Sequence, residues 1–137
     1  MKLKFLVLVI ITILLSFTLT SSFYLDYMLQ GVIELDIEME VGDVVGLDTD
    51  TSVISFGIVP LGGSAQRKVE MENTGYKPIK VYISKIGEIA EWVSISENNF
   101  ILWPSVKKEI LFTVNLSEKA GKGIYGGKAR FVLRRLL

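Results

Sequence analysis

Two patterns of hydrophobic and polar positions divide the chain. Residues 5–25 read FLVLVIITILLSFTLTSSFYL and contain no charge. From Gly31 onward, apolar and polar residues alternate with a period of two, which is typical of half-buried β-strands rather than helices. We therefore predict a hydrophobic segment over residues 1–25, a linker over 26–30, and an all-β domain over 31–137.

The hydrophobic segment predicts either a membrane anchor or a signal peptide. Its 21 uncharged residues suffice for a membrane-spanning helix. Lys2 and Lys4 precede it, which predicts a single-pass protein whose domain lies outside the cytoplasmic membrane. The alternative is cleavage near Ser22 and secretion. The anchor is favoured by aromatic residues of the kind found at membrane interfaces, namely Phe23, Tyr24 and Tyr27.

Residues 31–41, GVIELDIEMEV, give the clearest strand signal. The odd-numbered positions from Ile33 to Val41 are apolar and predict a buried face. The even-numbered positions form an acidic face that consists of Glu34, Asp36, Glu38 and Glu40.

Further short strands are expected at intervals set by Gly, Pro and Asn turns. They cover approximately residues 52–58, 66–72, 79–86, 92–96, 100–103, 108–116 and 128–134. Residues 87–92 can form at most one helical turn. Seven to eight strands in this arrangement predict an immunoglobulin-like β-sandwich, with its larger aromatic residues in the core, among them Trp92, Phe100, Trp103 and Tyr125.

The formal net charge is zero, which argues against a nucleic-acid partner. Between residues 5 and 66 there are eight acids and no base, whereas from Lys119 onward there are six bases and no acid. Either the acidic strand pairs with the basic final strand and the charges neutralise each other, or they form an interaction surface. The candidate interaction residues are Glu34, Asp36, Glu38, Glu40, Lys128, Arg130 and Arg134.

A second hypothesis concerns the same strand. A Gly- and Asp-rich stretch, residues 42–51, separates it from the rest of the domain. Residues 31–41 could then leave their own sheet and complete that of a neighbour, since an added strand gains main-chain hydrogen bonds and pocket contacts. This would make the protein a filament or homo-oligomer subunit.

The absence of cysteine and histidine restricts the possible chemistry. It excludes Cys or His nucleophile–base pairs and the usual zinc sites. No carboxylate pair is marked as catalytic, so we expect no enzyme activity and no cofactor. Two weaker candidates are an N-glycosylation sequon at Asn115 and, for calcium in the loop before residue 52, the side chains of Asp43, Asp48 and Asp50.

Several motifs resemble those of a known family of domains. They are Phe56-Gly57, the turn at 59–62, the Asn-x-Gly at 73–75, Pro104 and the G-x-Y-x-G-like stretch at 123–126. In the family this last stretch belongs to the closing strand, whereas its glycines by themselves predict a loop over 121–127. Over residues ~52–135 the chain resembles immunoglobulin-like domains of the major-sperm-protein, ASH and Hydin type, related modules of which occur in archaeal and bacterial surface proteins.

This resemblance implies non-catalytic binding or scaffolding, often through sheet edges. The architecture also resembles that of archaellum stator proteins, with one membrane helix and one external β-domain. We therefore expect a non-catalytic envelope protein that acts by protein–protein interaction, as a scaffold or stator-like component. The alternatives are the secreted, strand-donating subunit and a carbohydrate- or calcium-binding module.

Overall fold

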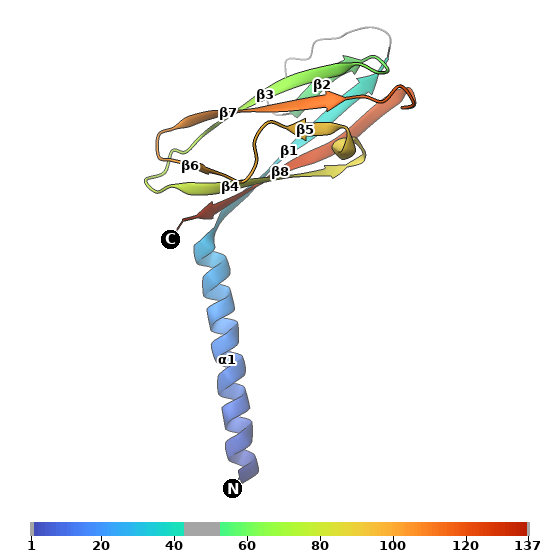
Figure 1. The fold of residues 1–137 in the computed structure, drawn as a ribbon. Helices are drawn as coiled ribbons and strands as arrows, with labels where there is room; N and C mark the ends of the chain where they lie inside the picture. Colours follow the sequence, from blue (N-terminus) through green and yellow to red (C-terminus); the bar gives the residue numbers. More distant parts are fainter. Residues whose placement is uncertain (1, 43–52, 137) are drawn as a thin grey trace.

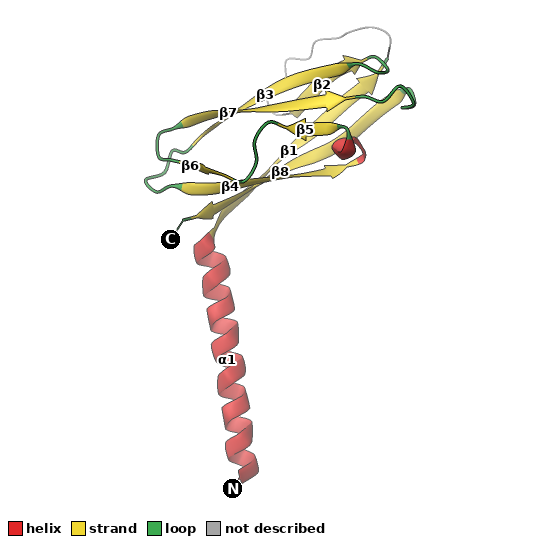
Figure 2. Cartoon of the chain, viewed as in Figure 1, coloured by secondary structure: helices red, strands yellow, loops and turns green. Residues whose placement is uncertain are grey.

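A computed structural model describes residues 2–42 and 53–136 (Figure 1). One long helix is followed by a domain of strands and a single 3₁₀ turn (Figure 2). In chain order the elements are α1 (Lys2–Met28), β1 (Leu29–Val41), β2 (Val53–Val59), β3 (Ser64–Glu72), β4 (Ile79–Gly87), η1 (Glu88–Glu91), β5 (Val93–Ile95), β6 (Phe100–Leu102), β7 (Lys107–Asn115) and β8 (Gly123–Arg135).

Helix α1 stands away from the domain and buries none of its residues (Figure 1). Its threonine hydroxyls donate to carbonyls of the preceding turn; Thr12 Oγ1, for example, lies 2.9 Å from the Leu8 oxygen. Such internal pairing is what an apolar surrounding requires of a polar group. Within the described residues α1 is the one helix long and apolar enough to cross a membrane, which is compatible with a single-pass anchor or a signal sequence.

The helix passes into the first strand without a linker. α1 ends at Met28 and β1 begins at Leu29, where pairing with Arg134 of β8 already starts. Residues 26–30, where the sequence predicts a linker, form the last helical turn and the first residues of the strand. The pairing with β8 determines this boundary, and the sequence of the junction does not reveal it.

Two sheets face each other across one core. Sheet A has the order β2-β1-β8-β4-β6 and sheet B the order β3-β7-β5. β1 runs antiparallel to β8 and parallel to β2. Inward-facing side chains of both sheets form one apolar cluster, and the rings of Phe112 on β7 and Phe131 on β8 lie 6.1 Å apart. This confirms an all-β domain preceded by one apolar helix.

Most of the predicted strands are present with shifted ends, but the final strand differs from expectation. β8 begins at Gly123, five residues before the predicted start at Lys128. The stretch 123–127, predicted as a loop, pairs with β1 and, at Gly127, with Gly87 of β4. Added side chains would clash here: a Cβ on Gly127 would lie 2.5 Å from the Ile86 oxygen. Gly127 therefore serves close strand approach rather than a turn.

The expectation that the large aromatic residues lie in the core holds only in part. Phe100 is buried, and half-buried Trp92 packs edge-on against Tyr125 with ring centroids 4.9 Å apart. Trp103, however, is 59% exposed, so its predicted core position is wrong. Leu102 points into the core, and the alternation of a strand turns the next side chain outward.

Candidate functional site: a half-open strand beside an apolar groove

Strand β1 is paired on both sides over only part of its length. β8 pairs with it from Leu29 to Val41, whereas β2 pairs with it only from Asp36 to Val41. Along residues 29–35, no strand of the described chain lies on the β2 side. Main-chain groups along that side are available for a further strand, because a sheet edge presents unpaired N–H and C=O groups.

An apolar groove of about 780 Å³ lies between the sheets beside this open edge. Ile33 and Leu35 of β1 line one side, and Val69 and Met71 of β3 line the other. The described part of β2 starts at Val53, opposite Asp36, and within the described residues no strand joins the two sheets beside the first half of β1. Deeper in the groove lie side chains of the core and its margin, namely Ile54, Ile79, Leu102, Phe131 and Leu133.

The charged residues at the rim of the groove are largely engaged within the domain. Arg67 of β3 donates through Nε to the carbonyl oxygen of Ser55 on β2. Lys68 pairs with Glu109 across sheet B at 3.0 Å. Lys107 lies 3.0 Å from Glu70 and 3.7 Å from Glu72, and these carboxylates raise the pKa of its ammonium group.

This arrangement is suited to binding an extended chain segment. The open half of β1 offers main-chain donors and acceptors to a strand laid beside it, while alternate side chains of that strand can enter the apolar groove. Because the rim charges already have partners, they do not select strongly for a charged ligand.

The acidic face of β1 pairs with β8, as the sequence predicted. Arg130 lies opposite Glu34, with 2.8 Å between Nε and Oε1. Lys128 lies opposite Asp36 and reaches both carboxylates, at 3.8 Å from Asp36 and 3.6 Å from Glu34. The Arg130 guanidinium, and secondarily Lys128, lower the pKa of Glu34. Charge neutralisation between the two strands is therefore confirmed for these four residues.

The other three candidate interaction residues lie elsewhere. Glu38 and Glu40 are exposed, lie opposite Gly126 and Ile124, and have no ion-pair partner within the described residues. Arg134 lies beyond the acidic stretch, opposite Leu29 on one side and Lys80 on the other. It therefore takes no part in the neutralisation.

The described residues do not test the two weaker candidates, the calcium site and the glycosylation sequon. Asp43, Asp48 and Asp50 lie outside the described residues, and within those residues no group of acidic side chains could hold a metal ion. Asn115, at the end of β7, is exposed.

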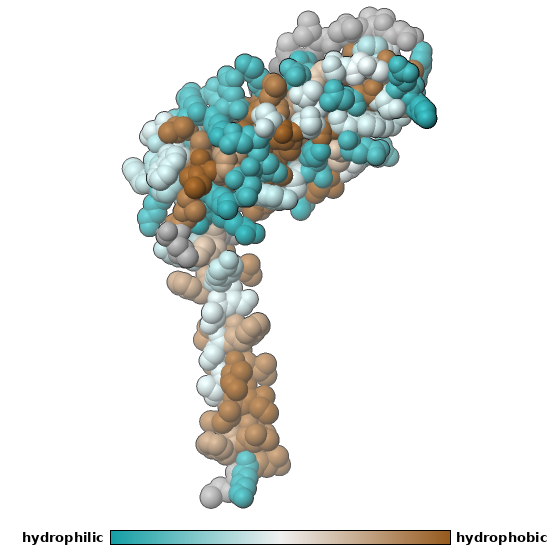
Figure 3. All heavy atoms as spheres, viewed as in Figure 1, coloured by the Kyte–Doolittle hydropathy of each residue, from teal (hydrophilic) through white to brown (hydrophobic). Residues whose placement is uncertain are grey.

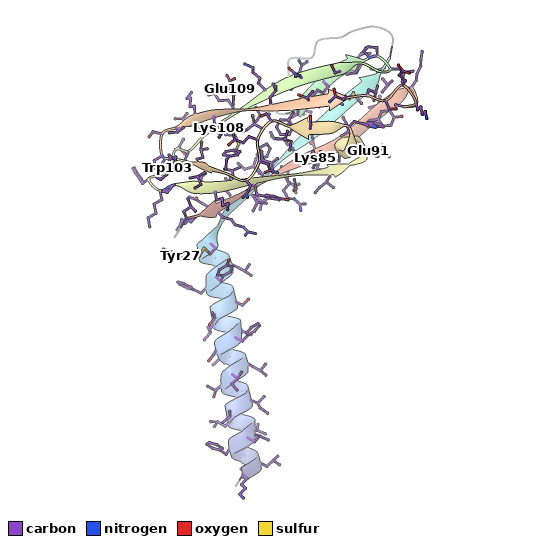
Figure 4. All side chains as sticks on the ribbon, in the orientation of Figure 1. Tyr27, Lys85, Glu91, Trp103, Lys108 and Glu109 are labelled. Atoms are coloured by element: carbon purple, nitrogen blue, oxygen red, sulfur yellow. The ribbon has the colours of Figure 1, made fainter. Side chains whose placement is uncertain are left out.

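The two tryptophans do not form a shared platform. Trp92 directly follows η1, whose Glu91 lies at one end of the domain, whereas Trp103 lies at the opposite end (Figure 4). A carbohydrate-binding surface built on both is thus excluded by their separation.

Sequence reasoning did not find the groove. Its walls come from alternate positions of β1 and β3, which read as ordinary core positions. One signal was present: the predicted strand 31–41 is longer than the strand 52–58 that follows it. That difference leaves part of one edge uncovered if the two strands pair.

Comparisons with protein-family models, with curated proteins and with solved structures find no match to this chain. The functional argument therefore depends on the residues and their geometry.

Proposed function

We propose that this protein is a membrane-anchored, non-catalytic binding protein of the cell envelope. Its immunoglobulin-like domain holds an extended segment of a partner protein in the groove between β1 and β3. The observation that carries this proposal is the open first half of β1 beside apolar walls from both sheets.

Retention of α1 as an anchor fits its properties. The helix is apolar, fully outside the domain, and satisfies its threonine hydroxyls internally. Lys2 and Lys4 at its start support a domain on the outer side of the membrane, because basic residues favour the cytoplasmic end of a membrane helix. The partner segment is then reached from the outer membrane surface, close to the point where β1 begins.

The geometry favours β1 as an acceptor of a strand over β1 as a donor. Donation of residues 31–41 would break the pairing with β8 along the whole strand and with β2 along its second half. It would also remove Ile37 and Met39 from the core, where their exposed fractions are 1% and 2%. Acceptance of a strand breaks none of these contacts.

Selection from a library of displayed linear peptides against the full-length protein in nanodiscs tests the groove. We expect enriched peptides to alternate apolar and polar residues, because only every second side chain of an added strand faces the groove. On binding, amides of residues 30–35 that do not bond to β8 should become protected from hydrogen exchange.

Two substitutions in β3 distinguish an effect on the groove from a general effect on the strand. Met71→Lys places a charge in the groove, whereas Gln66→Lys adds the same charge on the exposed face of β3. We expect Met71→Lys to abolish binding and Gln66→Lys to leave it unchanged. Equal loss in both variants, or protection of amides elsewhere, would contradict strand addition. Dimers whose formation depends on Met71 would identify a second copy as the occupant.

A further inference from the structure

One end of the outer face of sheet A combines exposed apolar and basic side chains. Across three strands, Val32 lies opposite Val132, which lies opposite Tyr82. On the neighbouring rung, Arg134 lies opposite Lys80, which lies opposite Ile101 of β6. We call these six residues the basic-apolar patch: Val32, Lys80, Tyr82, Ile101, Val132 and Arg134.

Three of the four apolar members of the patch are well exposed, whereas Val132 is half-buried. Val32, Tyr82 and Ile101 have exposed fractions of 46%, 51% and 43%. Trp103, which follows β6, adds a side chain that is 59% exposed. Figure 3 shows apolar side chains gathered at the end of the domain nearest α1. An aromatic and aliphatic surface of this kind is typical of residues at a membrane interface.

The basic members lack partners within the described residues. Lys80 and Arg134 face each other directly across β4 and β8, and neither takes part in an ion pair. Like charges at directly opposed positions disfavour a sheet unless an anion lies between or beside them. Lys128 and Arg130, further along β8, are in contrast neutralised by β1. Within the described residues, Lys80 and Arg134 are thus two opposed cations without an acidic partner at one end of sheet A.

The position of α1 indicates which kind of anion would lie beside Lys80 and Arg134. Sheet A forms the layer of the domain on the side from which α1 extends, with β3 and β7 of sheet B on the far side (Figure 1). Tyr27, in the last turn of α1, lies against Arg135 of β8, with 5.8 Å between the ring centroid and the guanidinium carbon. Figure 4 places Trp103 at the same end of the domain as Tyr27. The patch therefore adjoins the level at which α1 leaves the membrane.

We propose that the basic-apolar patch lies on the membrane surface and binds the headgroups of anionic phospholipids. Lys80 and Arg134 contact the phosphates, while Tyr82, Ile101 and Trp103 enter the headgroup region. The inference rests on the proposed role of α1 as an anchor and adds a second, lipid-specific contact. This lipid contact fixes the tilt of the domain relative to the bilayer.

Trp103 provides a native probe for this contact. A full-length Trp92→Phe variant retains Trp103 as its single tryptophan, and Trp103→Phe retains only Trp92 at the other end of the domain. Both are reconstituted in nanodiscs of phosphatidylcholine, with or without phosphatidylglycerol, that contain a phospholipid with a headgroup spin label. We expect quenching of Trp103 that increases with phosphatidylglycerol and decreases with salt, and little quenching of Trp92.

Charge reversal tests the basic residues. Lys80→Glu with Arg134→Glu should abolish the increase in Trp103 quenching caused by phosphatidylglycerol. Lys119→Glu reverses a charge at an exposed position away from both the patch and the groove and should preserve that increase. A thermal melt of each variant shows whether it is folded, and the Trp103 readout is compared only among folded variants.

The outcomes test the anchoring role of α1 and the lipid binding of the basic-apolar patch separately. Flotation of the wild type with vesicles at high salt reports α1 alone, so failure to float overturns the anchor. Flotation with equal quenching of Trp103 and Trp92 leaves the anchor standing and overturns the patch. Quenching of Trp103 that is insensitive to phosphatidylglycerol or to the Lys80/Arg134 reversal overturns its assignment to anionic lipid.

Discussion

At the scale of single residues, adjacent glycines of β8 have different roles. A Cβ on Gly127 would lie 2.5 Å from the Ile86 oxygen and 2.8 Å from a methyl group of Ile89. A Cβ on Gly126 would meet only the Ile37 oxygen, at 3.7 Å. Gly127 thus allows η1 and the end of β4 to pack closely on β8, whereas Gly126 has room for a side chain.

We expect Gly127→Ala to lower the free energy of unfolding by about 1–3 kcal/mol, because the clash involves backbone and a buried side chain that cannot both move away. Gly126→Ala, the matched control, should change it by less than about 0.5 kcal/mol. Chemical denaturation of the two variants measures both values. Equal effects would show that Gly127 is not constrained by β4 and η1.

The ion pair of Glu34 gives the domain a predictable dependence on pH. Arg130 and Lys128 lower the pKa of Glu34 below its ordinary value of 4.5. Its charged form is therefore favoured in the folded state, and this stabilisation is present above pH 4.5. It is lost as the pH falls through the lowered pKa of the folded state.

Denaturation of wild type and Glu34→Gln across the acidic range measures this effect. The difference in unfolding free energy should be largest near neutral pH and should shrink as the pH falls below about 4.5. Glu38→Gln removes a carboxylate from the same strand face without breaking an ion pair of the described structure, so its effect at neutral pH should be smaller. A pH-independent effect of Glu34→Gln would contradict the role of this pair.

At the scale of secondary-structure elements, the two halves of β1 differ in how they are paired. Its second half, Asp36–Val41, is internal to sheet A, whereas its first half is an edge. In the free protein we expect amides throughout the second half to be protected from hydrogen exchange. In the first half, only amides that bond to β8 should be protected, so fast and slow amides should alternate. Uniform protection of residues 30–35 would show that this edge is already covered.

The sequence predicted the positions of the strands better than it predicted which strands pair with each other. Alternation over 31–41 and the turn residues Asn73 and Pro104 fixed where strands lie, since each strand buries one face and each turn needs particular backbone angles. The glycine stretch 123–127 was misread as a loop, because glycine at a close strand approach and glycine in a turn are indistinguishable without the opposing strand. The groove was missed because an uncovered edge is a property of two strands together.

At the scale of the whole molecule, α1 joins β1 directly. Met28 and Leu29 belong to successive regular elements, so no irregular linker separates the helix from the domain. With α1 as the anchor that we propose, such a connection raises the effective concentration of the basic-apolar patch at the lipid surface without adding any contact.

Insertion of a short Gly/Ser segment between Met28 and Leu29 should weaken this coupling. At low salt, electrostatic attraction should hold the patch on anionic lipid in both proteins. At high salt, we expect the insertion variant to lose more of its Trp103 quenching than the wild type, because its domain is no longer held near the surface. Equal salt dependence in the two proteins would show that the junction does not orient the domain.

The sequence by itself determined the two-part organisation and the strand-forming segments, because these depend on local periodicity. It offered neutralisation of the acidic strand by the basic final strand as one of two interpretations, and the register of β1 with β8 decided it for Glu34, Asp36, Lys128 and Arg130. Only the tertiary structure decided that Trp103 faces outward and, within the described residues, that β1 is half open and that Lys80 and Arg134 lie opposite each other without an acid. Each of these depends on which strands become neighbours and how far they overlap, and pairing between segments distant in sequence determines that.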